Sequence, residues 1–556
     1  MSSYLIDSDS DDYYVATIGQ NRNHMALTGE NSTGESDDGR CHSSSSLIPP
    51  EEEHVVAQSY RTSDEYETSW KHILKAPLRA IQHQPENIQV EVPETAVDVK
   101  FSFRKLWAFT GPGFLMCIAY LDPGNIESDL QQGAIAGYNL LWVLLWATFL
   151  GFCLQSLSAR LGSVTGKNLA EHCREEFSFA PRITLWLLIE LAIIGSDIQE
   201  VIGSATAMRL LSSNFIPIWV GVLITGLDTF TFLFLEMYNL RNLEAFFGFL
   251  VTTMAVTFWY MYFSIWPQPD EVAKGVLIPG CNNCTSEAGS QALGIVGAVI
   301  MPHNLYLHSA LVLSRNIDRS NKATVKEANM YYAIESAGAL IISFFINLAV
   351  VAVFAEAFFG ENDATLSKAG DMIDDRFGKF MSIIWGIGIL ASGQSSTMTG
   401  TYAGQFVMEG FLDIRWPRWK RVLLTRTIAM LPTLMLALFA LTSLEVVSSW
   451  LNVLQSILLP FAILPVIAFT SKRSIMDTFV SPVPLRLIFG FLSIGLVGIN
   501  FALIYISVKE TDLPLGVLIL LSIIAVFYIL FIIYISFGYI IIGRVNAAQS
   551  RRAVNG

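Results

Sequence analysis

The stretch 119-AYLDPGN-125 interrupts a segment that is otherwise apolar from Leu106, and 298-AVIMPHN-304 interrupts a second apolar segment in the same manner. Each stretch places a proline and an amide side chain in a hydrophobic run. The first stretch also contains a carboxylic acid, Asp122, and the second contains a thioether, Met301. Proline has no N–H and kinks or breaks a helix, so Pro123 and Pro302 are each expected to unwind a turn and free backbone carbonyls. Either break alone is typical of a structural kink, but the matched pair favours a binding site.

The surrounding sequence indicates a membrane protein. Of the 556 residues 52% are hydrophobic and only 15% are charged, whereas soluble proteins average roughly 25% charged residues. From Phe101 onward, apolar runs near the ~20 residues that cross ~30 Å of hydrocarbon follow one another. We predict an all-α polytopic membrane protein with twelve spans, centred on 106–126, 137–159, 183–208, 215–238, 244–266, 291–313, 332–358, 379–400, 422–441, 447–469, 485–507 and 514–541.

The positions of the two breaks predict an inverted repeat. They lie in the first and sixth spans, and a separation of five spans inverts the second copy relative to the first. Proline-interrupted helices at corresponding positions of two inverted halves point to a transporter with its site at the repeat interface. We therefore divide a transporter domain, 101–545, into repeat one at about 104–266, repeat two at about 291–470 and extra helices at about 485–541. If both termini are cytosolic, most Lys and Arg residues of the connections lie on the cytosolic side, as the positive-inside rule expects.

The side chains at the breaks suit a transition metal. Asp122 offers an anionic oxygen, Asn125 a neutral oxygen and Met301 a soft sulfur, and the unwound turns add the carbonyls of Ala119 and Ala298. Ca²⁺ and Mg²⁺ prefer oxygen alone, whereas mixed sulfur and oxygen ligands suit Mn²⁺, Fe²⁺, Co²⁺ and Cd²⁺. Met301 is equally compatible with a gap-filling role in an apolar core.

The third span carries three acids, Glu190, Asp197 and Glu200, within roughly a 90° sector of one helical face. Carboxylates inside a membrane commonly mark proton paths. We predict such a path through Asp197 and Glu200 with His303, and His308 is a further candidate. Arg426 in the ninth span is the expected counter-charge. A purely structural salt-bridge network is the alternative.

The two ends of the chain differ from this membrane domain. Residues 1–100 are acidic and Ser-rich without apolar periodicity, which predicts a disordered cytosolic arm. Residues 546–556 form a predicted cytosolic tail. The chain offers no basic face for nucleic acid. The partners that we expect to bind the arm are trafficking proteins or ubiquitin ligases.

The connection between the fifth and sixth spans is predicted to lie outside the cell or in the lumen. Asn283 begins an Asn-x-Thr sequon there, so we expect glycosylation at this residue. Cys281 and Cys284 flank the sequon in an oxidising compartment. The three-residue step is tight for a disulfide, so a disulfide between them and a pair of free thiols both stay open, and either is favoured over a zinc site.

Three strings in order resemble the Nramp (natural resistance-associated macrophage protein) family: Asp122-Pro123-Gly124-Asn125, 301-MPHNLYLH-308 and 393-GQSSTMTGTYAGQFVMEG-410. The resemblance covers residues 101–539 and is most similar to animal divalent metal transporters. It implies a LeuT-like 5+5 inverted-repeat fold with helices 1 and 6 broken. It also implies metal ligation at the breaks, a proton route through the acids and Arg426, and pathway-lining roles for Gln455 and Asn347.

These observations predict proton-coupled transport of Fe²⁺, Mn²⁺, Co²⁺ or Cd²⁺ into the cytosol across the plasma membrane or an endosomal membrane. We expect no enzymatic activity and no cofactor, because the metal ions and protons are substrates. A non-transporting metal sensor on the same fold is the alternative. A sodium-coupled amino-acid symporter is disfavoured, because the fixed anion of Asp122 would repel a substrate carboxylate.

Overall fold

The computed structural model describes residues 90–91, 101–238, 240–281, 285–361, 364–414, 416, 418–439, 443–510 and 514–538. All of them belong to one of the two units into which the chain divides, Ser69–Gly556. Of the predicted arm, only Val90 and Glu91 are described. They form strand β1 (Val90–Glu91), which pairs in parallel with β2 (Arg315–Asn316). The predicted tail lies outside the described residues.

The first repeat consists of five spans, the first of them broken. Pro112 and Pro123 each start a helix at its first turn, where a missing N–H costs nothing. The spans are α3 (Pro112–Ile118) with α4 (Pro123–Ala136), then α5 (Leu141–Thr165), α7 (Phe179–Leu211), α8 (Ile218–Tyr238) and α9 (Leu240–Ile265).

The second repeat has the same pattern and ends with a second interrupted span. Its spans are α11 (Ser286–Val299) with α12 (Pro302–Leu311), then α13 (Lys322–Phe358), α15 (Lys379–Leu412), α16 (Arg418–Phe439) and α17 (Ser443–Leu458) with α18 (Pro460–Thr470). The extra helices are α20 (Val483–Glu510) and α21 (Leu515–Ile533). Each of the twelve predicted spans thus contains a helix.

Short elements connect these spans. They are α2 (Phe103–Phe109), α6 (Leu169–Glu176), α10 (Pro269–Leu277), α14 (Leu366–Phe377), α19 (Arg473–Met476), the 3₁₀ turns η1 (Val312–Ser314) and η2 (Asp477–Phe479), and the π-helical turn η3 (Tyr534–Gly538). The first span differs from its prediction. Residues 103–109 form the separate helix α2, and the broken span extends to Ala136, ten residues beyond the predicted 126.

Seven helical stretches in the described residues are long and apolar enough to cross a membrane. Two of the longest helices, α7 and α15, are not among them, because each carries buried polar side chains through its middle. Polar residues at membrane depth are tolerated where they face the interior of a bundle. Their burial between other helices is therefore consistent with membrane spans that carry a functional site.

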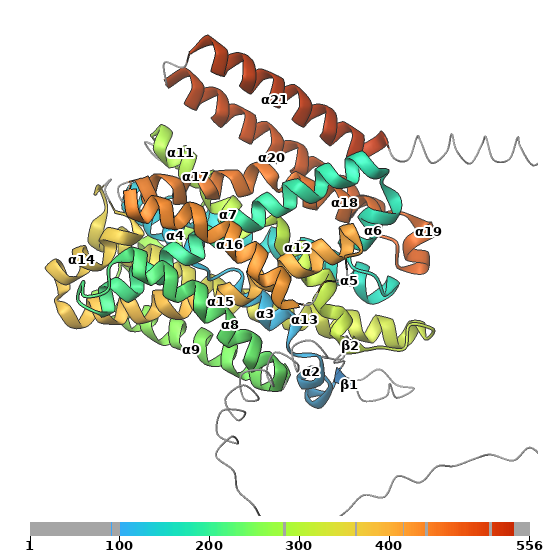
Figure 1. The fold of residues 1–556 in the computed structure, drawn as a ribbon, viewed down its shortest axis with the longest axis horizontal. Coiled ribbons are helices and arrows are strands. Elements are labelled where there is room, and N and C mark those ends of the chain that lie inside the picture. Colours follow the sequence, from blue (N-terminus) through green and yellow to red (C-terminus); the bar gives the residue numbers. More distant parts are fainter. Residues whose placement is uncertain are drawn as a thin grey trace, which may run out of the picture. The chain divides into compact units, whose positions relative to one another are not determined.

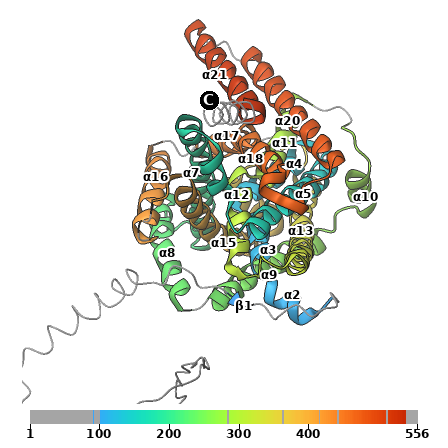
Figure 2. The same cartoon turned by 90° about the vertical axis from the view of Figure 1, so that its right-hand side faces the viewer.

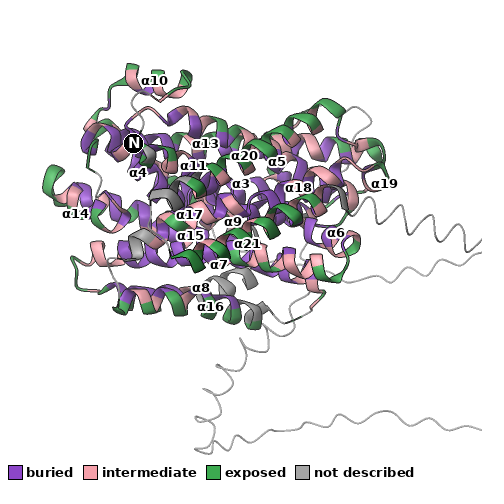
Figure 3. Ribbon diagram, turned by 90° about the horizontal axis from the view of Figure 1, so that it is seen from above, coloured by how far each residue is buried: buried purple, intermediate pink, exposed green. Residues whose placement is uncertain are grey.

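The broken helices lie at the centre of the described bundle. Helix α4 packs against α7, α11, α13 and α17, and α12 packs against α5 and α15. Figures 1 and 2 show α20 and α21 at the side of this bundle, next to α17 and α18. Figure 3 shows buried residues concentrated in inner helices such as α4 and α11 and exposed residues on outer elements such as α10. Helix α21 exposes large apolar side chains such as Ile523 and Phe527. An apolar periphery is expected of a protein whose solvent is lipid.

Glycines allow the closest helix contacts. A Cβ on Gly297 of α11 would overlap the backbone of Asn452 and Ser456 in α17, and a Cβ on Gly133 of α4 would overlap the backbone of α13. Small residues at such crossings let helices in membranes approach backbone to backbone. The second break is thereby fixed against the tenth span.

We predict that Gly297→Ala destabilises the protein by about 1–3 kcal/mol, because the added methyl group overpacks the contact between α11 and α17. The matched control is Gly338→Ala in α13, where a Cβ meets nothing within 4 Å. Thermal unfolding of both purified variants in detergent, followed by tryptophan fluorescence, measures the difference. Equal Tm values for the two variants would contradict the packing argument.

Candidate metal site and the buried ion network

The first break is a single turn, 119–122, between α3 and α4. Asp122 caps α4: its Oδ1 accepts hydrogen bonds from the backbone N–H of Asn125 at 3.0 Å and from Asn125 Nδ2 at 2.5 Å. Pro123 cannot donate to the carbonyl of Ala119 four residues earlier, so the helical ladder stops there. Asp122 Oδ2 and Asn125 Oδ1 are buried without a hydrogen-bond partner. One carboxylate oxygen and one amide oxygen therefore remain available to a ligand.

The second break repeats this geometry with a sulfur in place of the carboxylate. Met301 is the N-cap of α12 in an extended conformation, and Pro302 follows at the first helical position. Because Pro302 has no N–H, the carbonyl of Ala298 loses its helical donor. Asn304 Nδ2 reaches across to the carbonyl oxygen of Ala119 at 3.4 Å. This contact joins the two breaks.

Side chains from four other helices satisfy the freed backbone around the first break. The carbonyls of Ala119, Tyr120, Leu121 and Gly124 accept hydrogen bonds from, in order, Asn304 of α12, Asn347 of α13, Ser392 of α15 and Asn452 of α17. The last three distances are 3.0, 2.5 and 3.1 Å. Non-helical backbone at membrane depth requires such partners, because no bulk water is available there.

The five predicted metal ligands are all buried. The exposed fractions are 2% for Asp122, 1% for Asn125, 1% for Met301, 3% for Ala119 and 0% for Ala298. Within the described residues, no group of three or more His, Cys, Asp or Glu side chains could hold a metal ion. The candidate site therefore depends on one carboxylate complemented by an amide, a thioether and carbonyls.

A buried ion network lies beside the site on α7 and α16. The guanidinium of Arg426 lies 3.2 Å from Asp197 Oδ1 and 3.3 Å from Glu200 Oε2. It also donates to Thr401 Oγ1 at 3.0 Å and to the carbonyl of Thr397. The three ionic side chains are at most 3% exposed. Two carboxylates and one guanidinium leave one negative charge when both acids are ionised. Uptake of one proton would make the network neutral.

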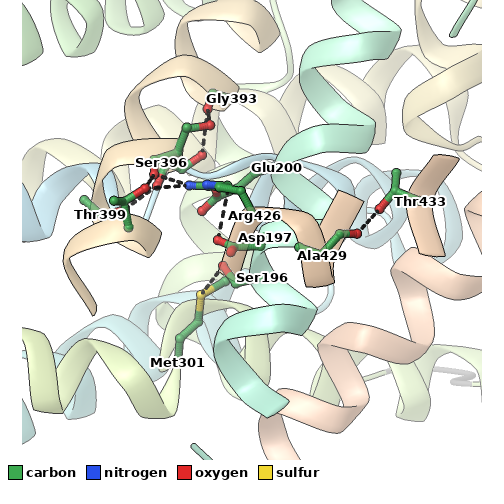
Figure 4. A network of polar contacts seen from close by, with 12 residues as sticks. Ser196, Asp197, Glu200, Met301, Gly393, Ser396, Thr399, Arg426, Ala429 and Thr433 are labelled. Atoms are coloured by element: carbon green, nitrogen blue, oxygen red, sulfur yellow. Dashed lines mark hydrogen bonds and ion pairs between the residues drawn. The ribbon is translucent and has the colours of Figure 1, made fainter. Parts of the chain in front are cut away.

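One contact connects this network to the second break. Ser196 Oγ lies 3.8 Å from Met301 Sδ, and Ser196 immediately precedes Asp197 in α7. Figure 4 shows Ser196 directed at Met301, with Asp197 and Glu200 of the same helix facing Arg426 of α16. Ser196 therefore links the Met301 sulfur to the acids of the ion network.

A family model described as natural resistance-associated macrophage protein-like (Nramp) matches residues 113–506. The chain belongs to the Nramp family. It is similar to human natural resistance-associated macrophage protein 2, at 51% identity over 482 residues, 82% of this chain and 84% of the relative.

Two solved structures establish the fold. A manganese transporter of Eremococcus coleocola has a TM-score of 0.70 and 32% identity over 82% of this chain and 97% of its own. Mhp1, a nucleobase-cation-symport-1 family transporter, has a TM-score of 0.50 and 15% identity over 77% of this chain and 97% of its own. These matches confirm the predicted LeuT-like architecture of this Nramp chain.

The two histidines of the Nramp motif lie outside the ion network. His303 is 3% exposed and His308 is 0% exposed, both on α12. Nδ1 of His303 and both ring nitrogens of His308 have no hydrogen-bond partner. In the described part of the chain neither histidine pairs with Asp197, Glu200 or Arg426. Their predicted proton-pathway role stays a prediction.

The remaining predicted pathway residues have definite positions. Gln455 Nε2 donates to the carbonyl of Ala192 at 2.7 Å, which ties α17 to α7, and its Oε1 is buried without a partner. Asn347 binds the first break as described above. Glu190 lies on α7 about two turns before Asp197, half-buried and with Oε2 unpartnered. It makes no ion pair with Arg426 in the described chain.

The predicted extramembrane features fall partly outside the described residues. Asn283 and Cys284 are not described, so glycosylation and the pairing partner stay predictions. Cys281 is disulfide-bonded.

Of the four side chains that donate to carbonyls at the first break, the sequence predicts a role for Asn347 alone. Asn304 was visible inside the second proline motif, and Ser392 directly precedes the string 393–410. Asn452, in contrast, carries no local signal, because its role depends on the distance between α17 and α4. Three-dimensional packing is needed to identify it.

We predict that Arg426→Met costs about 3–5 kcal/mol of folding free energy at neutral pH, because it strands two buried carboxylates without a counter-charge. At acid pH these carboxylates take up protons, so the deficit shrinks. Unfolding temperatures measured at pH 5.5 and pH 8 test this difference.

The matched control is the charge-free triple variant Asp197→Asn/Glu200→Gln/Arg426→Met, which should regain most of the lost stability at pH 8. A loss of Tm in Arg426→Met that is the same at both pH values would show that lost packing, rather than charge, is responsible.

Proposed function

We propose that this Nramp chain moves divalent transition metal ions, Mn²⁺ and Fe²⁺ above all and also Co²⁺ and Cd²⁺, into the cytosol by proton-coupled alternating access. One observation carries the proposal: the free oxygens of Asp122 and Asn125 lie at a helix break that is joined to the break carrying Met301. The solved Nramp relative that transports manganese supports the choice of metal class.

The donor set explains the expected selectivity. One carboxylate cannot neutralise a divalent cation, so binding is weak enough for release. The Met301 sulfur stabilises borderline and soft ions, whereas Ca²⁺ and Mg²⁺ gain little from a thioether. Selectivity thus arises from ligand type more than from charge.

Alternating access follows from the burial of the ligands. Each of the five ligands is at most 3% exposed, so an ion reaches them only if the helices around the breaks move. The unwound turns at 119–122 and 300–301 are natural hinges, because half-helices can tilt there without breaking a continuous ladder. An inside-negative potential favours inward movement by ~2.3 kcal/mol per charge per 100 mV.

Charge balance supports proton coupling. Metal binding requires an ionised Asp122, so a proton held there must leave as the ion arrives. The network of Asp197, Glu200 and Arg426 is one proton short of neutrality and touches Met301 through Ser196. It is the proposed acceptor and the proposed route to the cytosol.

We place the protein in the plasma membrane or an endosomal membrane with both termini cytosolic. The arm would then present its acidic, Ser-rich sequence to trafficking or ubiquitin-ligase partners. We propose no catalytic reaction and no cofactor.

The deciding experiment reconstitutes the full chain in liposomes and follows Mn²⁺ entry together with internal pH. We predict uptake that an inward proton gradient accelerates, with internal acidification. Asp122→Ala should lower uptake at least about 100-fold, because the only ionic ligand is lost. Asp318→Ala, an exposed acid between η1 and α13, is the control and should transport normally.

Two outcomes would refute parts of this proposal. Wild-type uptake by Asp122→Ala would remove Asp122 from the metal site. Metal entry without proton movement would return the acids of α7 and Arg426 to a structural role.

We further predict that Met301→Ala relaxes discrimination against Ca²⁺ by about tenfold, because the remaining ligands are all oxygen. The ratio of Mn²⁺ to Ca²⁺ uptake measures this change. Met254→Ala removes an equally buried thioether from α9, a helix that carries neither break, and should leave the ratio unchanged. A ratio equally unaffected in Met301→Ala would contradict the sulfur argument.

A further inference from the structure

Helix α4 is unusually polar for a buried element. Six of its polar side chains are at least nine-tenths buried: Asn125, Glu127, Ser128, Asp129, Gln131 and Gln132. At about 100° per residue, Glu127 and Gln131 share one face, whereas Asn125, Asp129 and Gln132 fall within a sector of about 60° on the opposite face. The two faces differ in their bonding.

The first face is bonded to its neighbours. Glu127 accepts hydrogen bonds from Gln131 Nε2 at 2.5 Å and from the backbone N–H of Leu366 at 2.7 Å. Gln131 also donates to Ser449 at 3.1 Å and accepts from Gln291 at 3.0 Å. The polar side chains on this face therefore link α4 to α11, α14 and α17 by hydrogen bonds.

The second face lacks such partners. Asp129 is 1% exposed, and it makes no hydrogen bond or ion pair to any residue in the described ranges, with Oδ2 buried and unpartnered. Gln132 is 0% exposed, and both its amide oxygen and its amide nitrogen are unpartnered. Buried polar groups without partners are rare in folded proteins and call for an explanation such as a ligand.

Charge indicates which class of ligand this face suits. Asp122 caps α4 and Asp129 lies two turns further along the same buried helix, and like charges so placed repel each other. A water molecule would satisfy the hydrogen bonds of Asp129 but not its charge. A cation satisfies both.

We infer that Asp129 and Gln132 form an outer cation subsite, which receives a divalent metal ion before it reaches Asp122. The inference rests on the proposed function, which makes α4 the half-helix leading from the outside to the break. Seven residues of helix separate the two acids by roughly 10 Å, so the subsite is distinct from the ligands at the break. Asn125 lies between them on the same face.

The chemistry of the subsite differs from that of the inner site. A carboxylate and an amide offer oxygen alone, which suits a hydrated divalent ion and does not distinguish hard from borderline metals. The negative charge of the subsite therefore raises the local concentration of divalent ions. Discrimination follows at Met301.

The first test measures initial Mn²⁺ uptake against concentration in liposomes. Asp129→Asn should raise KM about tenfold, because the charge of the first binding step is lost, and should lower Vmax less than threefold. The control is Glu127→Gln, which removes a carboxylate from the bonded face and should shift KM less than twofold. An unchanged KM in Asp129→Asn would overturn the inference. An equal rise in KM for both variants would also overturn it, because the effect would then reflect the net charge of α4.

The second test separates this inference from the proposed function by measuring binding without transport. Isothermal titration of the purified full chain with Mn²⁺ should detect weak residual binding in Asp122→Ala and none in Asp122→Ala/Asp129→Asn. Equal binding by the single and double variants would overturn the subsite, even if Asp122 proves essential for transport. Normal transport by Asp122→Ala would refute the proposed function, whereas the comparison of the two titrations would still decide on Asp129.

Discussion

The whole site depends on keeping one turn of backbone unwound where no bulk water can solvate it. Pro123 frees the carbonyl of Ala119, the carbonyls of Tyr120 and Leu121 in the unwound turn also need donors from outside the segment, and the carbonyl of Gly124 in the first turn of α4 accepts a further hydrogen bond. Asn304, Asn347, Ser392 and Asn452 provide these donors from α12, α13, α15 and α17. A buried peptide group without a partner is costly, so these hydrogen bonds hold four helices around the break. They also orient Asp122 and Asn125 toward a ligand, because the backbone that carries both residues is fixed.

The same arrangement connects the proposed metal ligands to the buried ion network. Asn304 belongs to the second break and bonds to the first, so a shift of either half-helix is felt by the other. Met301 touches Ser196, next to Asp197, and Arg426 holds Asp197 and Glu200 from α16. A buried pair of acids with one guanidinium is sensitive to a single proton, since losing or gaining it changes the net charge in a medium of low dielectric. One short path of contacts thus joins the ion network to the proposed metal ligands.

Much of this fold is predictable from local sequence. Pro123 and Pro302 locate both breaks, because the loss of an N–H acts within one turn and needs no tertiary context. The prediction weakens where polar residues are buried. The first span extends to Ala136 rather than 126, since hydropathy counts Glu127, Asp129 and Gln131 as solvent-exposed when neighbouring helices in fact cover them. Proline alone is also ambiguous: helices continue through Pro432 and Pro465, whereas Pro460 separates α17 from α18 within the predicted span 447–469. The partners of the freed carbonyls require the packed structure.

The central claim is that the two breaks together bind a transition metal through oxygen and a thioether. X-ray absorption spectroscopy of Mn²⁺ bound to the purified protein tests this claim most directly, because it identifies the atoms around the ion without relying on transport. The account predicts a shell of oxygen ligands with one sulfur, and loss of the sulfur in Met301→Ala. A shell of oxygen alone in the unmodified protein would contradict it.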